Sequence, residues 1–319
     1  MGAVRAVACG LLLAAGAGTQ AAEARPAALL LTDVGSAGAR QVAVGDRGQI
    51  LLSDDQGRHW QAARTPGGPL LTAVYFVDDR HGWAVGHDAR ILASADGGAS
   101  WTLQFQDPGR QAPLLGLWFA DPDHGLAVGA YGLLLATDDG GAHWQDVSAR
   151  LDNPEQLHLN AITAVRGAGL MIVGEQGVMF RSADAGQTWQ RLQGPYSGSW
   201  FGAIATGQAS TLLVYGLRGH LYRSSDFGAS WQACALPGDT APLDAGLAGA
   251  TRLPDGSLVL VGSGGAVLRS LDDGRSFSRV QRPDRRDLAA VVALPEGLLL
   301  VGQGGAHRAA NSGLEEPQP

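Results

Sequence analysis

Lysine is absent from this chain of 319 residues, so all 23 of its basic residues are arginines. With 30 acidic residues the formal net charge is −7, and no stretch of the sequence is markedly basic. Proteins that bind nucleic acid usually carry a basic surface. We therefore expect no nucleic-acid partner.

Cysteine is scarce as well. The two cysteines are Cys9, inside an apolar N-terminal segment, and Cys234. If that segment is removed, one thiol remains and no internal disulfide can form. A catalytic thiol needs a histidine and an orienting partner nearby, whereas a buried core cysteine needs neither. We interpret Cys234 as a core residue.

Long apolar runs are also missing. One run extends from Ala6 to Gly16, follows Arg5 and precedes small residues up to Ala22. At about 11 residues it is too short to span a bilayer but is typical of a secretory signal peptide. We predict a signal peptide over residues 1–21, cleaved after Ala21 or Ala22, and a periplasmic or secreted mature chain without a transmembrane span. A lipoprotein anchor at Cys9 is the alternative interpretation.

An eight-residue pattern, here called a box, occurs six times: Ser or Thr, any residue, Asp, any residue, Gly, two further residues and an aromatic ring. The aromatic residues of successive boxes lie 41, 43, 45, 42 and 46 positions apart. A repeat of this length is typical of a propeller or a solenoid. The boxes are Ser53-Asp55-Gly57-Trp60, Ser94-Asp96-Gly98-Trp101, Thr137-Asp139-Gly141-Trp144, Ser182-Asp184-Gly186-Trp189, Ser224-Asp226-Gly228-Trp231 and Ser270-Asp272-Gly274-Phe277.

A short apolar run ending in Gly precedes each box and occurs once more near the C-terminus. Short apolar runs between Gly and Asp residues are typical of strands. In repeat two we predict strands over residues 72–77, 83–85, 90–94 and 101–104, which make one four-stranded antiparallel blade. The sequence therefore predicts an all-β fold, a single seven-bladed β-propeller over residues 22–310 with a flexible tail over residues 311–319. The seven runs end at Gly45, Gly86, Gly129, Gly174, Gly216, Gly262 and Gly302.

The first strand of each repeat carries a small residue at its third position, as expected where the strands converge on the central axis. In the first repeat, Thr32 has the same offset. The last repeat lacks a box, and we expect residues 23–28 to supply its outer strand, which would close the ring. The small residues of repeats two to seven are Ala73, Gly116, Ala161, Gly202, Gly249 and Ala290.

The box itself is interpreted as turn chemistry. Its hydroxyl and carboxylate can accept hydrogen bonds from backbone N–H groups of a tight turn, its Gly permits positive φ, and its ring can wedge between sheets. A calcium loop at residues 137–141 is the alternative, but no bidentate Glu follows at the required spacing. His59 and His143 occupy the same box position, so we interpret them as structural and expect no metal and no cofactor.

The sequence from Trp83 to Leu92, followed by Asp96-Gly97-Gly98-Ala99-Ser100-Trp101, resembles the photosystem II stability and assembly factor family within the BNR/Asp-box repeat group. The resemblance covers about residues 27–310. It implies a seven-bladed propeller that helps a membrane-protein complex to assemble, without catalysis. Members also occur in bacteria that do not photosynthesise, so a role in photosynthesis does not follow.

The resemblance also implies a patch of arginines on one propeller face. Arg181, Arg223 and Arg269 directly precede the box Ser on three consecutive blades, where earlier blades have Leu52, Ala93 and Ala136. Three neighbouring guanidinium groups could bind an acidic partner surface. The alternative is that they are solvated residues at strand ends.

A second candidate surface is the loop that enters blade five, where Tyr196, Trp200 and Phe201 are aromatic. Aromatic residues in a loop favour a binding surface, although Trp200 and Phe201 can equally begin the inner strand. The insert over residues 148–158 is the other irregular surface.

Asp-box sialidases and glucanases provide the enzymatic alternative. Sialidases need an arginine cluster, a Tyr nucleophile with a Glu partner, and an acid. The chain lacks their Phe-Arg-Ile-Pro signature, and between residues 30 and 290 its only glutamates are Glu155 and Glu175. We therefore expect a monomeric, non-enzymatic scaffold that binds a protein of a membrane or cell-envelope complex. A carbohydrate-binding lectin that uses Trp200 is a further alternative.

Overall fold

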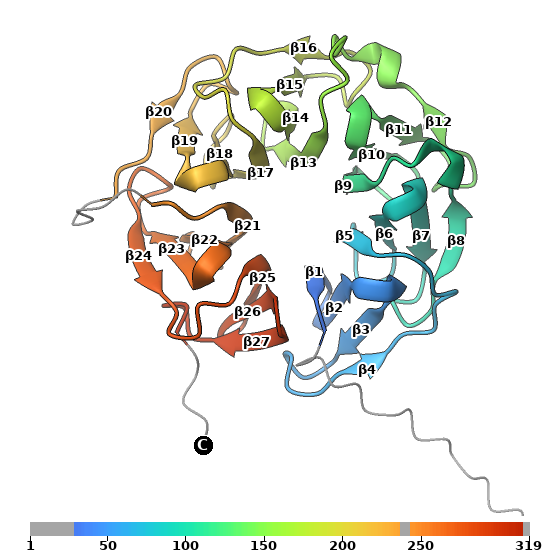
Figure 1. Ribbon diagram of the computed structural model, residues 1–319, viewed down its shortest axis with the longest axis horizontal. Helices are drawn as coiled ribbons and strands as arrows, with labels where there is room; N and C mark the ends of the chain where they lie inside the picture. Colours follow the sequence, from blue (N-terminus) through green and yellow to red (C-terminus); the bar gives the residue numbers. More distant parts are fainter. Residues whose placement is uncertain (1–28, 237–242, 315–319) are drawn as a thin grey trace, which may run out of the picture.

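The computed structural model describes residues 29–236 and 243–314, and the predicted signal peptide lies outside them. Seven antiparallel sheets form a ring around a central channel, so the prediction of a seven-bladed propeller is confirmed (Figure 1). In each sheet the strands follow one another in sequence order from the channel to the rim. No helix in the described residues is long and apolar enough to span a membrane.

The first three blades have four strands each. Blade one comprises β1 (Leu31–Ala37), β2 (Arg40–Gly45), β3 (Ile50–Ser53) and β4 (Gln61–Ala62). Blade two comprises β5 (Leu71–Phe76), β6 (Gly82–Gly86), β7 (Arg90–Ser94) and β8 (Thr102–Phe105). Blade three comprises β9 (Leu114–Phe119), β10 (Gly125–Gly129), β11 (Leu134–Thr137) and β12 (Gln145–Asp146).

The next three blades repeat this order, whereas the described part of blade seven has three strands. Blade four comprises β13 (Leu159–Val165), β14 (Gly169–Gly174), β15 (Met179–Ser182) and β16 (Gln190–Arg191). Blade five comprises β17 (Trp200–Ala205), β18 (Leu212–Gly216), β19 (Leu221–Ser224) and β20 (Gln232–Ala233). Blade six comprises β21 (Leu247–Arg252), β22 (Leu258–Gly262), β23 (Ala266–Ser270) and β24 (Ser278–Gln281), and blade seven comprises β25 (Leu288–Leu294), β26 (Gly297–Gly302) and β27 (Gly305–Ala309).

Short 3₁₀ turns mark one face of the ring. In six blades such a turn joins the second strand to the third, directly after the Gly that ends the apolar run. Because the strands alternate in direction, the boxes lie on the opposite face, together with the turns that join first and second strands. We call this the box face. The six turns are η2 (Asp46–Gly48), η3 (His87–Ala89), η5 (Ala130–Gly132), η7 (Glu175–Gly177), η8 (Leu217–Gly219) and η9 (Ser263–Gly265), while η4 (Pro108–Arg110) and η6 (Ser148–Arg150) lie between blades.

Strand register corrects one prediction about the inner ring. Ala73 pairs with Val85, and the equivalent residue of blade one is Asp33, which pairs with Val44, rather than Thr32. Only two residues join β1 to β2, so the offset from the Gly at the end of the second strand is shorter by one in this blade. A carboxylate therefore stands where six blades place a small residue.

Blade seven closes the described ring with little pairing to blade one. A single antiparallel bridge joins Leu30 to Gln303. The predicted closing strand, residues 23–28, lies outside the described residues. Part of the predicted tail is described: Gly313 accepts a hydrogen bond from Arg282 through its carbonyl at 3.1 Å and lies against Val267 of blade six.

The hydrophobic core lies between the blades. Each cluster of buried side chains combines residues of two neighbouring blades, mainly from their first three strands. For example, Leu299 of blade seven packs with Trp60 of blade one, and Leu213 of blade five packs with Phe277 of blade six. Stability of the ring therefore depends on how adjacent blades meet.

Candidate functional site: a pocket between blades three and four

The boxes use their polar atoms within the turn. In the box of blade two, Ser94 Oγ accepts a hydrogen bond from the N–H of Gly98 at 2.9 Å and donates one to Asp96 at 2.9 Å. Asp96 also accepts the N–H and the hydroxyl of Ser100. Gly98 has φ +83°, a conformation that side chains with a Cβ rarely adopt. The box carboxylate is thus an acceptor in the turn.

The charge state of the box carboxylates fits this role. In blade three, hydrogen bonds from the N–H and then the imidazole of His143 hold the pKa of Asp139 at about 2. In blade four, hydrogen bonds from the hydroxyl and N–H of Thr188 hold the pKa of Asp184 at about 2. A general acid needs a raised pKa, so these groups are ill suited to that chemistry.

The box aromatic rings reach into the preceding blade. Trp101 is buried among side chains of blades one and two and makes an edge contact with Phe76, the ring centroids being 5.9 Å apart. Trp189 packs with side chains of blade three, and Trp231 with side chains of blade four. Each ring wedges between two sheets, so we call the contact of each box with the preceding blade a junction.

The backbone of the box forms a second contact at most junctions. The fourth residue of every box has positive φ, between 55° and 69°. At five junctions this carbonyl accepts a hydrogen bond from a side chain of the preceding blade. The pairs are Arg308–Gln56, Arg40–Gly97, Gln104–Gly140, Arg181–Phe227 and Arg223–Asp273.

The three predicted partner-binding arginines are therefore engaged within the ring. Arg181 donates to the carbonyl of Phe227 at 3.0 Å and lies 5.8 Å from the centre of its ring. Arg223 donates to the carbonyl of Asp273 at 2.9 Å and to its carboxylate at 2.8 Å, with 11% of its side chain exposed.

Arg269 differs because blade seven has no box. It donates instead to the carboxylate of Asp255, in its own blade, at 3.2 Å. The three guanidinium groups thus bind three separate internal acceptors. Binding of an acidic partner by this row stays a prediction.

At the junction between blades three and four, no side chain of blade three among the described residues donates to the equivalent carbonyl, that of Ala185; Arg150 donates to the next one, that of Gly186. The position that holds Arg181 in blade four holds Ala136 in blade three, paired with Leu126. Blade two also has an alanine there, Ala93, but its partner Trp83 fills the space by stacking on Phe119 at 3.5 Å. With only Leu126 and Ala136 to fill the equivalent space, blade three leaves a pocket of about 380 Å³.

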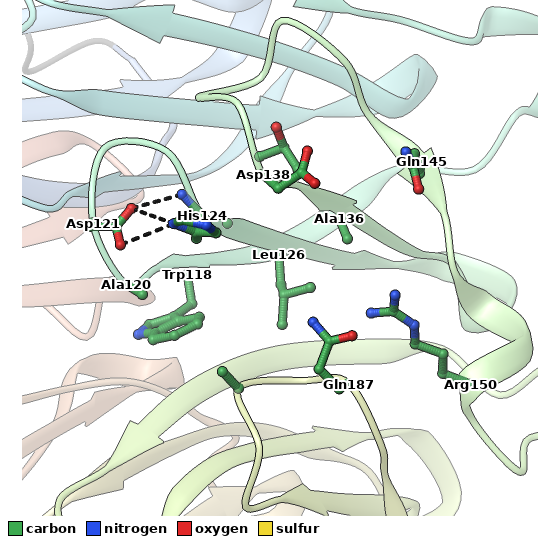
Figure 2. A pocket seen from close by; sticks show the side chains of 13 residues that line it. Trp118, Ala120, Asp121, His124, Leu126, Ala136, Asp138, Gln145, Arg150 and Gln187 are labelled. Carbon is green, nitrogen blue, oxygen red and sulfur yellow. Dashed lines mark hydrogen bonds and ion pairs between the residues drawn. The ribbon is translucent and has the colours of Figure 1, made fainter.

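Figure 2 shows how two blades build this pocket. Trp118, Leu126, Ala136 and Gln145 come from the four successive strands of blade three and form one row across the sheet. Gln187 comes from the box of blade four. A tryptophan ring and aliphatic groups thus form the wall, while polar side chains surround it.

Two carboxylates lie in the lining, Asp121 and Asp138. The Asp121 carboxylate binds the imidazole of His124 at 2.9 Å. This hydrogen bond, with the backbone N–H groups of His124 and Asp123, lowers the pKa of Asp121, and the same carboxylate raises the pKa of His124. Arg150 also lines the pocket, but its guanidinium donates to the carbonyl of Gly186 at 3.1 Å.

Of the two interpretations of the predicted aromatic loop, the structure supports the one in which Trp200 and Phe201 begin the inner strand. Trp200 begins the inner strand β17 and is 0% exposed, so a glycan could not reach its ring. Tyr196 stacks on His220, with ring centroids 3.6 Å apart. Phe201 is 36% exposed and lines the central channel. Of these three, Phe201 presents the most exposed ring to a partner.

The central channel holds one ionisable group that the sequence reasoning missed, Asp33. Burial raises the pKa of Asp33 to about 7, although the N–H groups of Val74 and Val34 each donate to its carboxylate at 2.8 Å. Tyr215 lines the same cavity, and burial and then the charge of Asp33 raise its pKa. Aligning the repeats by strand register, rather than by a fixed offset, would have revealed Asp33.

The described residues also bear on metal binding and on thiol chemistry. No group of three or more His, Cys, Asp or Glu side chains there is arranged to hold a metal ion. Burial raises the pKa of the Cys234 thiol to about 12, so it is a poor nucleophile at neutral pH.

Comparison with known proteins places this architecture in a family. Residues 104–317 match the model of the family described as photosynthesis system II assembly factor YCF48. No curated protein sequence matches the chain.

Solved structures share the fold. A structure described as YCF48 bound to D1 peptide is 19% identical, with a TM-score of 0.68, and the match covers 88% of this chain and 93% of that chain. YCF48 from Cyanidioschyzon merolae is 16% identical, with a TM-score of 0.67, over 88% of this chain and 95% of that chain. Virginiamycin B lyase from Staphylococcus aureus is 10% identical, with a TM-score of 0.72, over 89% and 96%.

A lyase on the same ring shows that the fold alone does not decide function. The family model, in contrast, matches about two thirds of this sequence. On that match, the chain belongs to the photosynthesis system II assembly factor YCF48 family.

Proposed function

We propose that this chain is a non-enzymatic scaffold that binds a protein of a membrane-associated complex and assists its assembly or stability. Family membership supports this proposal, and one solved YCF48 was captured with a peptide of D1. The observation that carries it is the pocket between blades three and four. There the ring departs from its own repeat and offers a tryptophan, two glutamines and two carboxylates on the surface.

The chemistry of the two cavities favours binding over turnover. The central channel offers one carboxyl, Asp33, and two phenols, Tyr75 and Tyr215, and its described lining includes no arginine or histidine. A sialidase uses an arginine cluster together with its Tyr and acid. In the pocket, Asp121 is paired with His124 and its pKa is lowered, which suits recognition rather than proton donation.

We place the protein on the exported side of a membrane, as a monomer. The predicted signal peptide at residues 1–21 supports this location, and a scaffold exported there would meet the parts of membrane proteins that project from the bilayer. The family name points to photosystem II, but the partner of this chain is proposed only as a membrane or cell-envelope complex.

Co-purification tests the scaffold. The full chain with a C-terminal tag is expressed in its own host, and membranes are solubilised in mild detergent before capture. We expect a membrane-protein complex to co-purify in stoichiometric amount and to become less abundant when the chain is deleted. Glycosidase turnover that disappears in the Asp33→Asn variant would instead establish an enzyme and overturn the proposal.

Separation of the exported fraction tests the location. We expect the mature chain to begin at Ala22 or Glu23 and to fractionate with periplasmic or secreted protein. Retention of residues 1–21 in a cytoplasmic fraction would contradict this part of the proposal.

A further inference from the structure

The pocket occupies the place that an arginine side chain fills at the next junction. Across blade four, the row equivalent to the pocket wall contains Arg181, with Gln190 beside it on the outer strand. In blade three the equivalent residues are Ala136 and Gln145. The two rows thus differ at this position by the whole arginine side chain beyond Cβ.

The acceptors that hold Arg181 have equivalents in the pocket. Arg181 Nε donates to Gln190 Oε1 at 3.0 Å, and its terminal nitrogen donates to the carbonyl of Phe227 at 3.0 Å. Gln145 corresponds to Gln190, and Ala185 corresponds to Phe227. Both line the pocket, and within the described residues no side chain of blade three donates a hydrogen bond to either.

The rest of the lining suits a cation. Trp118 provides an aromatic face, as Phe227 does for Arg181 at 5.8 Å, and such faces attract guanidinium groups. Asp121 and Asp138 add negative charge. Arg150, the one arginine in the lining, already donates to the carbonyl of Gly186.

We infer that the pocket between blades three and four binds the guanidinium side chain of an arginine carried by the partner protein. The planar fork of a guanidinium matches a glutamine oxygen and a backbone carbonyl, which an ammonium group engages less specifically. This inference rests on the proposed scaffold function and names the chemistry of the partner at that surface.

NMR titration with a small probe tests the pocket. The probe is N-acetyl-arginine N-methylamide, and the control is the citrulline analogue, which has the same shape without the charge. We expect the indole N–H of Trp118 and the side-chain amide of Gln145 to shift saturably with arginine. Citrulline should bind about tenfold more weakly, because hydrogen bonds from a charged donor are the stronger ones. Equal shifts with both probes would overturn the inference.

Two variants fill the pocket from within. Ala136→Arg reproduces the row of blade four, and Leu126→Trp reproduces the packing of Trp83 in blade two. Each should abolish the arginine response, whereas Ala136→Ser should keep it. Arginine binding that persists in either folded filled variant would overturn the inference, and two filling strategies guard against one that fails to fold.

The partner complex separates this inference from the scaffold itself. Loss of the complex from both filled variants supports the pocket as its arginine site. A complex that binds the filled variants as tightly as the natural chain overturns the pocket's role and leaves the scaffold standing. Arginine binding in a chain that captures no complex leaves the pocket standing and overturns the scaffold.

Discussion

Two neighbouring junctions of this ring have the same turn, the same aromatic wedge and the same backbone acceptor, yet one is closed and the other is open. Between blades four and five, Arg181 reaches the carbonyl of Phe227. Between blades three and four, Ala136 leaves a pocket of about 380 Å³ in front of Ala185. The two junctions differ in one side chain at equivalent strand positions, Arg181 in blade four and Ala136 in blade three.

This contrast separates the residues that hold the blades together from those that shape the surface of the ring. The box turn and its aromatic side chain occur at both junctions, so they provide the contact between blades that both junctions share. The donor side chain is replaceable, since Arg40 on a second strand and Gln104 on a fourth strand supply it at other junctions, where Arg181 stands on a third strand. A position that is replaceable without loss of the fold is one where a binding pocket can arise.

The largest effect is expected from the shared wedge. Trp231→Ala at the closed junction and Trp189→Ala at the open one should each lower the free energy of unfolding by about 3 kcal/mol, because each removes a large ring packed between sheets. Urea denaturation followed by circular dichroism measures both. A loss at Trp189 several times smaller than at Trp231 would show that the open junction does not depend on its wedge.

A smaller effect is expected from the buried ion pair at the next closed junction. Arg223→Ala should cost about 2 kcal/mol, because it leaves the carboxylate of Asp273, 18% exposed, without its guanidinium partner. Arg269→Ala is the matched control: its bond to Asp255 lies within one blade, at a carboxylate that is 55% exposed, and should cost well under about 1 kcal/mol. Equal losses in the two variants would contradict the assignment of Arg223 to the junction.

Removing the arginine side chain at the junction between blades four and five should create a second pocket there. Arg181→Ala should destabilise the chain by about 1 kcal/mol, since it removes hydrogen bonds from a partly exposed arginine. It should also create a second site for N-acetyl-arginine N-methylamide, seen as new shifts at the side-chain amide of Gln190. Denaturation and titration are measured on the same sample. A variant that binds no probe there would show that the frame needs more than the missing side chain to make a pocket.

The smallest expected effect is the pH dependence of arginine binding at the open junction. Asp121 raises the pKa of His124, so His124 carries a positive charge at pH 6 and loses it as the pH rises through that raised value. The pKa of Asp121 is lowered, so its carboxylate stays ionised throughout. Arginine affinity should therefore rise about twofold between pH 6 and pH 9, as expected for screened surface charges. The His124→Gln variant should show a flat profile, and a wild-type affinity that falls with pH would contradict the assignment.

Sequence reasoning predicted the blades well because the box and the apolar run ending in Gly depend on local turn chemistry. It placed Thr32 where the structure has Asp33, because turn length varies between blades and a fixed offset cannot follow it. It noticed that Ala136 stands where later blades have arginine, but it interpreted the arginines, rather than the alanine, as the candidate binding site. Their acceptors are backbone carbonyls of the next blade, which no side-chain pattern reveals, so the significance of the alanine emerged only from the packing.

The fourth residue of the box has a consequence for how such a ring can change over generations. The contact that five junctions share is made by its carbonyl, so residues as different as Gln56, Gly97, Phe227 and Asp273 serve at equivalent places. The side chains of Phe227 and Asp273 add contacts of their own. Variation of this side chain leaves the shared backbone contact in place. Substitutions at this position can therefore change the box face, where a partner would bind, while the backbone contacts between neighbouring blades are kept.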